Sequence, residues 1–300
     1  LTMHNKKFSF YFCLSVFIAF VFFLYGPTFT IILLSFQGPE GGLTFPMNGI
    51  STHWFTKLFE GGGYVDIGAA FRRSLLLGTI VMVLTVVLSV AAGMAFRKRF
   101  LGSDTLFYLT ISSLIVPSII LSLGIALEFR LLDETIKFIG GAFNIEWILN
   151  DFQTSLAMFS SGLGAQLTWT LPFGLLIMFA VFNRFDKSLE EAARDLGASP
   201  WQTFTNVVLP IIGPSILGIA LFGFTLSYDE LARSSQVMGA TNTLPLELKG
   251  LTTTVTTPVI YALGTLTTAV SFCAIFIFLS LFLVFRNKAN KRLSEEVVPK

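Results

Sequence analysis

The sequence predicts an all-α membrane protein with six transmembrane helices and both termini in the cytoplasm. Hydrophobic residues make up 53% of the 300 residues and charged residues 13%, whereas a typical soluble domain is about 25% charged. Six intervals without a charged residue are each long enough to cross a bilayer, which takes about 20 apolar residues in a helix. These intervals also lack the alternation of apolar and polar residues that is typical of transmembrane β-strands.

Charged residues mark the ends of the predicted spans, because one charge at the centre of a bilayer costs roughly 2.5–3.5 kcal/mol. Together the spans form one membrane domain over 8–285, between a cytoplasmic N-terminus, 1–7, and a cytoplasmic C-terminal tail, 286–300. In chain order, the predicted spans are 8–36, 74–96, 105–127, 160–183, 208–228 and 259–285.

The first predicted span follows Lys6 and Lys7, a basic start that resembles a secretion signal. Its uncharged interval is longer than the 7–15 residues of a usual signal core and lacks a clean cleavage pattern, so we expect it to stay uncleaved. Apolar runs fill the second, fourth and sixth spans over 80–90, 175–182 and 272–285. The third span, 105–127, is less apolar but long enough.

The positions of Lys and Arg predict the orientation. With the N-terminus inside, thirteen of these residues fall on the inner side and seven on the outer side, and an excess of positive charge indicates the cytoplasmic face. Two outer loops, about 38–73 and 128–159, exceed the usual connection length, so we expect each to hold short helices.

Composition also excludes some functions. A formal net charge of +2 gives no support to a nucleic-acid-binding surface. The two cysteines, Cys13 and Cys273, each lie inside an apolar run, which argues against a disulfide framework or a metal cluster. With His4 near the terminus and His53 in an outer loop, neither a His-based metal site nor a Cys-His pair is evident.

The inner segment 187–210 predicts a rigid helical hairpin. It contains two capping-box patterns, with a proline at the favoured first position of the second helix. Gly197 between them suits the left-handed residue that ends a helix. Such a hairpin fits a groove on a partner protein, and the alternative is an ordinary solvated connector. The capping residues are Ser188 with Glu191, and Ser199 with Gln202, with Pro200 after Ser199.

The same segment resembles the EAA motif of ABC importer permeases. Glu191-Ala192-Ala193 is followed after three residues by Gly197, and after nine more by Val207-Val208-Leu209-Pro210. The usual ending of the motif is Ile-x-Leu-Pro, so only Val207 departs from it, and conservatively.

The resemblance extends over nearly the whole chain and is closest to the second permease subunit of spermidine/putrescine-type importers. It includes TLPF at 170–173, TLSYDE at 225–230 and TLP at 243–245. An outer insertion around 137–151 is longer than expected for such subunits, which weakens the transfer of substrate identity more than that of the fold.

The resemblance implies a type I ABC importer permease fold in a bacterial inner membrane, surrounded by lipid. The loop 187–210 would dock onto ATP-binding cassette subunits, which hydrolyse ATP in place of this chain. A second permease subunit and a periplasmic or extracellular substrate-binding protein would complete the importer, with a polyamine or related amine as solute and no cofactor. The coupling residues implied are Glu191, Ala192, Ala193, Gly197, Leu209 and Pro210.

Four residues are candidates for the solute path. Asp229 and Glu230 stand at the outer end of the fifth predicted span, where acidic groups attract a cationic amine or merely end the helix in water. Trp169 and Tyr228 offer aromatic faces to an alkylammonium group, although such residues are more often interfacial anchors or packing.

Two other functions remain open from the residues alone. A secondary transporter or channel working alone predicts an internal repeat and ionisable residues near the middle of the membrane. The sequence has no convincing repeat, and the interior of every predicted span is uncharged. An intramembrane enzyme based on serine is not excluded, but nothing distinguishes one serine from the others.

Overall fold

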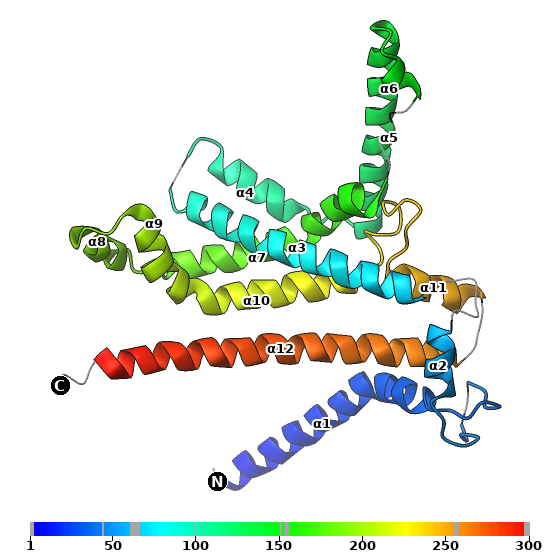
Figure 1. Ribbon diagram of the computed structural model, residues 1–300. Coiled ribbons are helices and arrows are strands. Elements are labelled where there is room, and N and C mark those ends of the chain that lie inside the picture. The colour runs from blue at the N-terminus through cyan, green and yellow to red at the C-terminus, as the bar shows by residue number, and fades with distance from the viewer. Residues whose placement is uncertain are drawn as a thin grey trace. The chain divides into compact units, whose positions relative to one another are not determined.

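The protein is described here by a computed structural model (Figure 1) that covers residues 3–43, 45–60, 67–98, 100–150, 152, 156–254 and 258–296. The ends of the two predicted cytoplasmic termini, 1–2 and 297–300, lie outside these residues. Helices dominate, and the β-structure of the described ranges is one isolated bridge between Gln37 and Ile50. The predicted all-α class is therefore confirmed.

Among the described residues, five helical stretches are long and apolar enough to cross a bilayer, judged by length and composition. They cover five of the six predicted spans, and two of them begin with shorter helical pieces that continue into the main helix. The elements concerned are α1 (Met3–Leu34), α3 (Ile67–Phe96), η1 (Met158–Gly162) with α7 (Leu163–Asn183), α9 (Pro200–Thr203) and η2 (Phe204–Val208) with α10 (Leu209–Tyr228), and α12 (Val259–Glu296).

The prediction of one helix over 105–127 is wrong. The structure has two helices there, α4 (Ser103–Ser112) and α5 (Ser118–Ala142), separated by a non-helical segment. Pro117 explains the break, because proline has no backbone N–H and disfavours the α conformation of the residue before it. The ψ of Pro117 is 129°, which is extended rather than helical.

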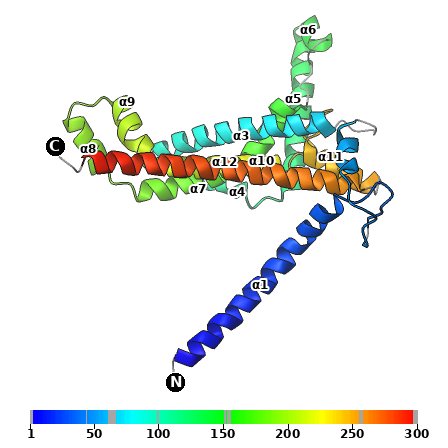
Figure 2. The same cartoon turned by 60° about the horizontal axis from the view of Figure 1, so that its bottom comes forward.

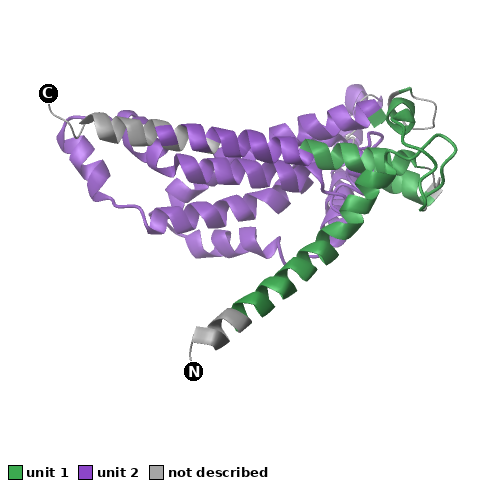
Figure 3. Ribbon diagram, turned by 90° about the horizontal axis from the view of Figure 1, so that it is seen from below, with its two compact units in different colours: residues 1–67, 248–270 green, residues 68–247, 271–300 purple. Residues whose placement is uncertain are grey.

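The chain divides into two compact units (Figure 3). Unit 1 comprises 1–67 and 248–270, and unit 2 comprises 68–247 and 271–300. Unit 1 contains α1, α2 (His53–Phe59) and part of α11 (Leu244–Thr254). The short helix α2 shows that the long loop predicted over 38–73 holds a helix, as expected.

In unit 2, α3, α7 and α10 run beside one another (Figures 1 and 2). Their contact is close because small residues lie at the crossings. A Cβ added to Gly174 on α7 would fall 2.0 Å from the Ser89 hydroxyl on α3, so no larger residue fits without a shift. The buried core between these helices is formed by Met178, Phe182, Val208, Ile212 and Ile219.

The two ends of this helix layer carry different structures. At one end, α5 extends away and is followed by the short helix α6 (Glu146–Asn150), which lies in the second long loop predicted to hold a helix. At the other end, α8 (Ser188–Asp195) and α9 form the predicted hairpin (Figures 1 and 2).

Candidate functional site

The hairpin 187–210 has the turn that its glycine predicts. Gly197 has φ of 85°, in the left-handed region. Its N–H donates to the Arg194 carbonyl at 2.8 Å, and the Ala198 N–H donates to the Ala193 carbonyl at 3.0 Å. This pair of bonds is the Schellman motif, which satisfies the last carbonyls of a helix. The chain therefore leaves α8 in one defined direction.

One of the two predicted capping boxes is present. The Ser199 hydroxyl accepts from the Gln202 N–H, the Gln202 side chain accepts from the Ser199 N–H, and Pro200 follows the cap. The box predicted for Ser188 and Glu191 is wrong, because the Asp186 carboxylate takes the Ser188 N–H at 2.9 Å instead. The backbone and side chain of Ser188 both donate hydrogen bonds to the Asp186 carboxylate, and these bonds lower its pKa.

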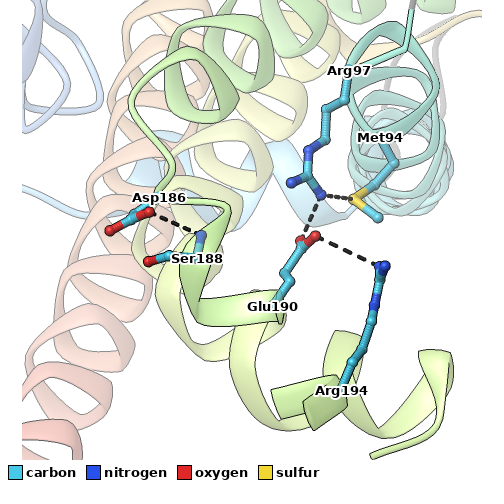
Figure 4. A network of polar contacts seen from close by, with 6 residues as sticks. All are labelled: Met94, Arg97, Asp186, Ser188, Glu190 and Arg194. Carbon is cyan, nitrogen blue, oxygen red and sulfur yellow. Dashed lines mark hydrogen bonds and ion pairs between the residues drawn. The ribbon is translucent and has the colours of Figure 1, made fainter. Parts of the chain in front are cut away.

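A buried ion pair fastens α8 to the end of α3 (Figure 4). The Arg97 Nη1 donates to the Glu190 Oε1 at 2.6 Å, and each side chain is only 12% exposed. The Arg97 guanidinium also lies 5.1 Å from the ring centroid of Phe182 and 5.2 Å from that of Phe185. Such cation–π contacts strengthen when the cation is desolvated. The pair therefore ties the hairpin to the C-terminal end of α3.

Arg97 also lines a cavity of about 260 Å³ beside the hairpin. Four phenylalanine side chains line it, and Lys187 at the start of the hairpin segment contributes a second cation. The lining residues are Gly93, Phe96, Arg97, Phe179, Phe182, Asn183, Phe185 and Lys187.

The opposite face of the hairpin is exposed. Leu196 is 90% exposed and Trp201 is 71% exposed, while Glu191 and Ala192 are also exposed. Large apolar side chains rarely gather on a free surface without a partner. Of the other coupling residues, Ala193 is half-buried, and Leu209 and Pro210 are exposed at the start of α10.

The acidic candidates for the solute path lie just beyond α10. Asp229 is exposed and caps the C-terminus of α10, and partial burial of its carboxyl raises the pKa. Glu230 is half-buried, and its carboxylate accepts the backbone N–H of Arg233 at 2.8 Å. The structure therefore ties Glu230 to its own loop and leaves Asp229 the more accessible acid.

The aromatic candidates are both engaged by the chain itself. The guanidinium of Arg233 lies 4.7 Å from the centre of the Trp169 ring, where an alkylammonium group was expected. Tyr228 is 4% exposed and stacks on Phe224 with ring centroids 5.7 Å apart. Arg233 links Trp169 to Glu230, so these two candidates share one cluster.

Three residues that the sequence prediction did not select are central to these contacts. Glu190 precedes the motif and points inward, whereas the motif residue Glu191 is exposed. Arg97 and Arg233 had counted only as charges at span ends. One signal was present for Arg97, which is the first charge after a long uncharged interval.

Comparison with known proteins gives a consistent family. Residues 85–288 match the family described as "Binding-protein-dependent transport system inner membrane component". The spermidine/putrescine transport system permease protein PotC of Haemophilus influenzae is 27% identical over 245 residues, 81% of this chain and 86% of PotC. The putrescine transport system permease protein PotI of Escherichia coli is 28% identical over 247 residues, 81% of each chain.

Two solved structures share the fold. One is a bacterial ABC transporter involved in the import of the acidic polysaccharide alginate, with a TM-score of 0.65 and 16% identity over 95% of this chain and 97% of that one. The other is a bacterial alginate ABC transporter in complex with an alginate pentasaccharide-bound periplasmic protein, with a TM-score of 0.63 and 16% identity over 92% of this chain and 93% of that one.

Proposed function

This chain belongs to the family of binding-protein-dependent transport system inner membrane components, and from that premise we propose how its parts work in transport. It is a multi-pass permease subunit of an ABC importer in the inner membrane. The hairpin 187–210 receives the ATP-binding subunits on the cytoplasmic side, and these subunits hydrolyse the ATP.

The exposed face of the hairpin supports this docking role. Leu196 and Trp201 present apolar surface, while Glu191 and Arg194 provide charged contacts at the rim. The Schellman turn and the capping box hold the two helices in one geometry, so a partner meets a preorganised surface. The observation that carries the proposal is the buried Arg97–Glu190 pair, because it connects this surface to α3.

The transport step follows from a change between two packings. When the ATP-binding subunits close, they push the hairpin, and the Arg97–Glu190 pair passes the displacement to α3 and its neighbours. The packed helices then exchange an outward-open for an inward-open arrangement. Such a change requires each partner to bind one of the two arrangements more tightly than the other. On the cytoplasmic side this partner is the pair of ATP-binding subunits with ATP, and on the opposite side it is the binding protein.

The solute we propose is a polyamine or a related amine, taken from an extracytoplasmic binding protein at a mouth shared with a second permease subunit. Two observations support this class. Relatives at 27% and 28% identity are spermidine/putrescine and putrescine permeases. Asp229, at the end of α10, is an exposed acidic residue, and a carboxylate attracts a cation.

Substitutions in the hairpin test the docking role. Glu191→Lys reverses a charge on the exposed face, and Gly197→Val puts a β-branched residue in the left-handed region at a cost of roughly 1–2 kcal/mol. We expect both to abolish ATP-driven uptake while the chain still inserts into the membrane. Leu101→Ala, at an exposed site outside the hairpin, is the control. Normal uptake in both hairpin variants would contradict the docking role.

A further inference from the structure

The loop between α10 and α11 is irregular and yet buried. Arg233, Ser234 and Val237 are fully buried, and Thr243 is 3% exposed. Irregular segments normally lie on the surface, because buried backbone groups must find hydrogen-bond partners. Here the neighbouring helices supply them. Ser161 donates to the Val237 carbonyl at 2.7 Å, Ser122 accepts the Gln236 N–H at 3.2 Å, and Ser74 accepts the Leu244 N–H at 2.8 Å.

Arg233 connects this loop to both sides of the break in the third predicted span. Its Nη2 donates to the Ser113 carbonyl at 2.8 Å, just after α4, and its Nε donates to the Ser118 hydroxyl at 3.2 Å, at the start of α5. A cation is favourable at the C-terminal end of a helix such as α4, where carbonyl groups lack partners.

The same guanidinium reaches α7. Its Nη1 donates to the Thr168 hydroxyl at 2.5 Å, and its carbon lies 4.7 Å from the centre of the Trp169 ring. A second contact crosses the same junction, since the Ser113 hydroxyl donates to the Thr168 carbonyl at 2.7 Å. One side chain therefore joins α4, α5, α7 and its own loop.

Packing alone does not require a charge at this position. Burial lowers the pKa of Arg233, and the nearby Glu230 carboxylate opposes that change. Among the described residues, no carboxylate lies within ion-pair distance of the Arg233 guanidinium. A nonpolar side chain of similar length would fill the space without the cost of removing a cation from water.

We propose that Arg233 is a positioning residue for transport, a latch that holds the broken helix pair α4 and α5 against α7 while the outer end is closed. Its release lets the two helices separate from α7 when the binding protein engages. This inference rests on the proposed function, and it assigns the outer conformational step to one side chain and the segment 113–117.

The first test measures ATP hydrolysis by the complete transporter, assembled with its ATP-binding subunits, with and without the binding protein. Arg233→Met removes three side-chain hydrogen bonds and is expected to raise hydrolysis without binding protein at least about tenfold, because one hydrogen bond to a charged group already supplies about that factor. Arg233→Lys keeps the charge but not the fork of donors. Its rate of hydrolysis without binding protein is expected to lie between those of the wild type and Arg233→Met. Arg130→Met, an exposed arginine on α5, is the matched control and should behave as the wild type.

The second test does not depend on removing Arg233. In a chain whose Cys13 and Cys273 are replaced by alanine, the double variant Ser113→Cys and Thr168→Cys is joined by oxidation or by a short thiol cross-linker. Transport should stop in the joined form and return, on cleavage of the link, to the level of the same double variant before it was joined. Undiminished transport in the joined form would overturn the latch. This result would hold even if the Arg233→Met variant failed to assemble.

The two levels of the proposal fail differently. A wild-type transporter without binding-protein-stimulated hydrolysis would overturn the permease role and the latch with it. A stimulated wild type whose Arg233→Met and Arg233→Lys variants keep the same dependence on binding protein would overturn the latch alone.

Discussion

Two arginines hold unit 2 together near the two ends of α7. Arg97 lies against Phe182 and Phe185 near the C-terminal end of α7, and Arg233 lies against Trp169 near its beginning. These contact points are about 20 Å apart along the axis of a helix that rises 1.5 Å per residue. Each arginine joins another segment to the helix layer: Arg97 joins the hairpin, and Arg233 joins the loop after α10.

The Arg97–Glu190 pair predicts a specific pattern of mutant effects. Arg97→Met or Glu190→Gln leaves the other group buried without its partner, which costs roughly 3 kcal/mol. We expect either change to reduce uptake strongly, while the exchange Arg97→Glu with Glu190→Arg restores part of it. Uptake in vesicles, normalised to the amount of inserted protein, is the measurement. An exchange variant no better than the two single variants would argue against a direct pair.

Asp229 makes a prediction about the solute. Asp229→Asn removes the accessible carboxylate at the end of α10 and keeps the shape, so uptake of an amine should fall through a higher KM with little change in the maximal rate. Glu247→Gln, an acidic residue in the first turn of α11, is the matched control. Equal KM values in Asp229→Asn and the wild type would remove Asp229 from the solute path.

At the scale of elements, local patterns in the sequence were the most reliable guide. Gly197 and Ser199 predict the turn and the second helix start of the hairpin, because the interactions that form them span only a few residues. The uncharged intervals likewise place the long apolar helices, since desolvation of charge is the dominant cost in a bilayer.

Contacts between distant parts of the chain could not be predicted in the same way. Arg97 and Glu190 are 93 positions apart, and Arg233 and Ser113 are 120 apart, so only the tertiary fold brings them together. The break at Pro117 could not be predicted from local sequence either. Pro27, Pro172 and Pro214 lie inside continuous helices, so a proline breaks a span only where neighbours such as Arg233 satisfy the freed groups.

The hairpin itself makes a prediction at this scale. Ser199→Ala removes the side chain that accepts the Gln202 N–H, and loss of such a cap costs about 1 kcal/mol. Amide exchange in residues 200–205 should accelerate about fivefold, since local opening controls exchange there. Ser199→Asp, which keeps an acceptor, should exchange like the wild type. Slow exchange in Ser199→Ala would show that the cap does not hold the second helix.

At the scale of the whole molecule, the helix layer carries different structures at its two ends. The exposed hairpin 187–210 lies at one end of α7, and α5 with α6 lies at the other (Figures 1 and 2). The excess of Lys and Arg favours the cytoplasm for the hairpin end. ATP-driven work and solute delivery would thus act on opposite ends of one packed unit, and the two arginines lie on the route between them.

The central claim is that the exposed face of this hairpin docks on an ATP-binding subunit, and site-specific photo-cross-linking in cells tests it most directly. A photoreactive residue replaces Leu196, which is 90% exposed on the hairpin, or Phe138, which is 79% exposed on α5 at the other end. The probe at 196 should capture the co-expressed ATP-binding subunit, and the probe at 138 should not. Capture from 138 and none from 196 would contradict both the docking surface and the orientation.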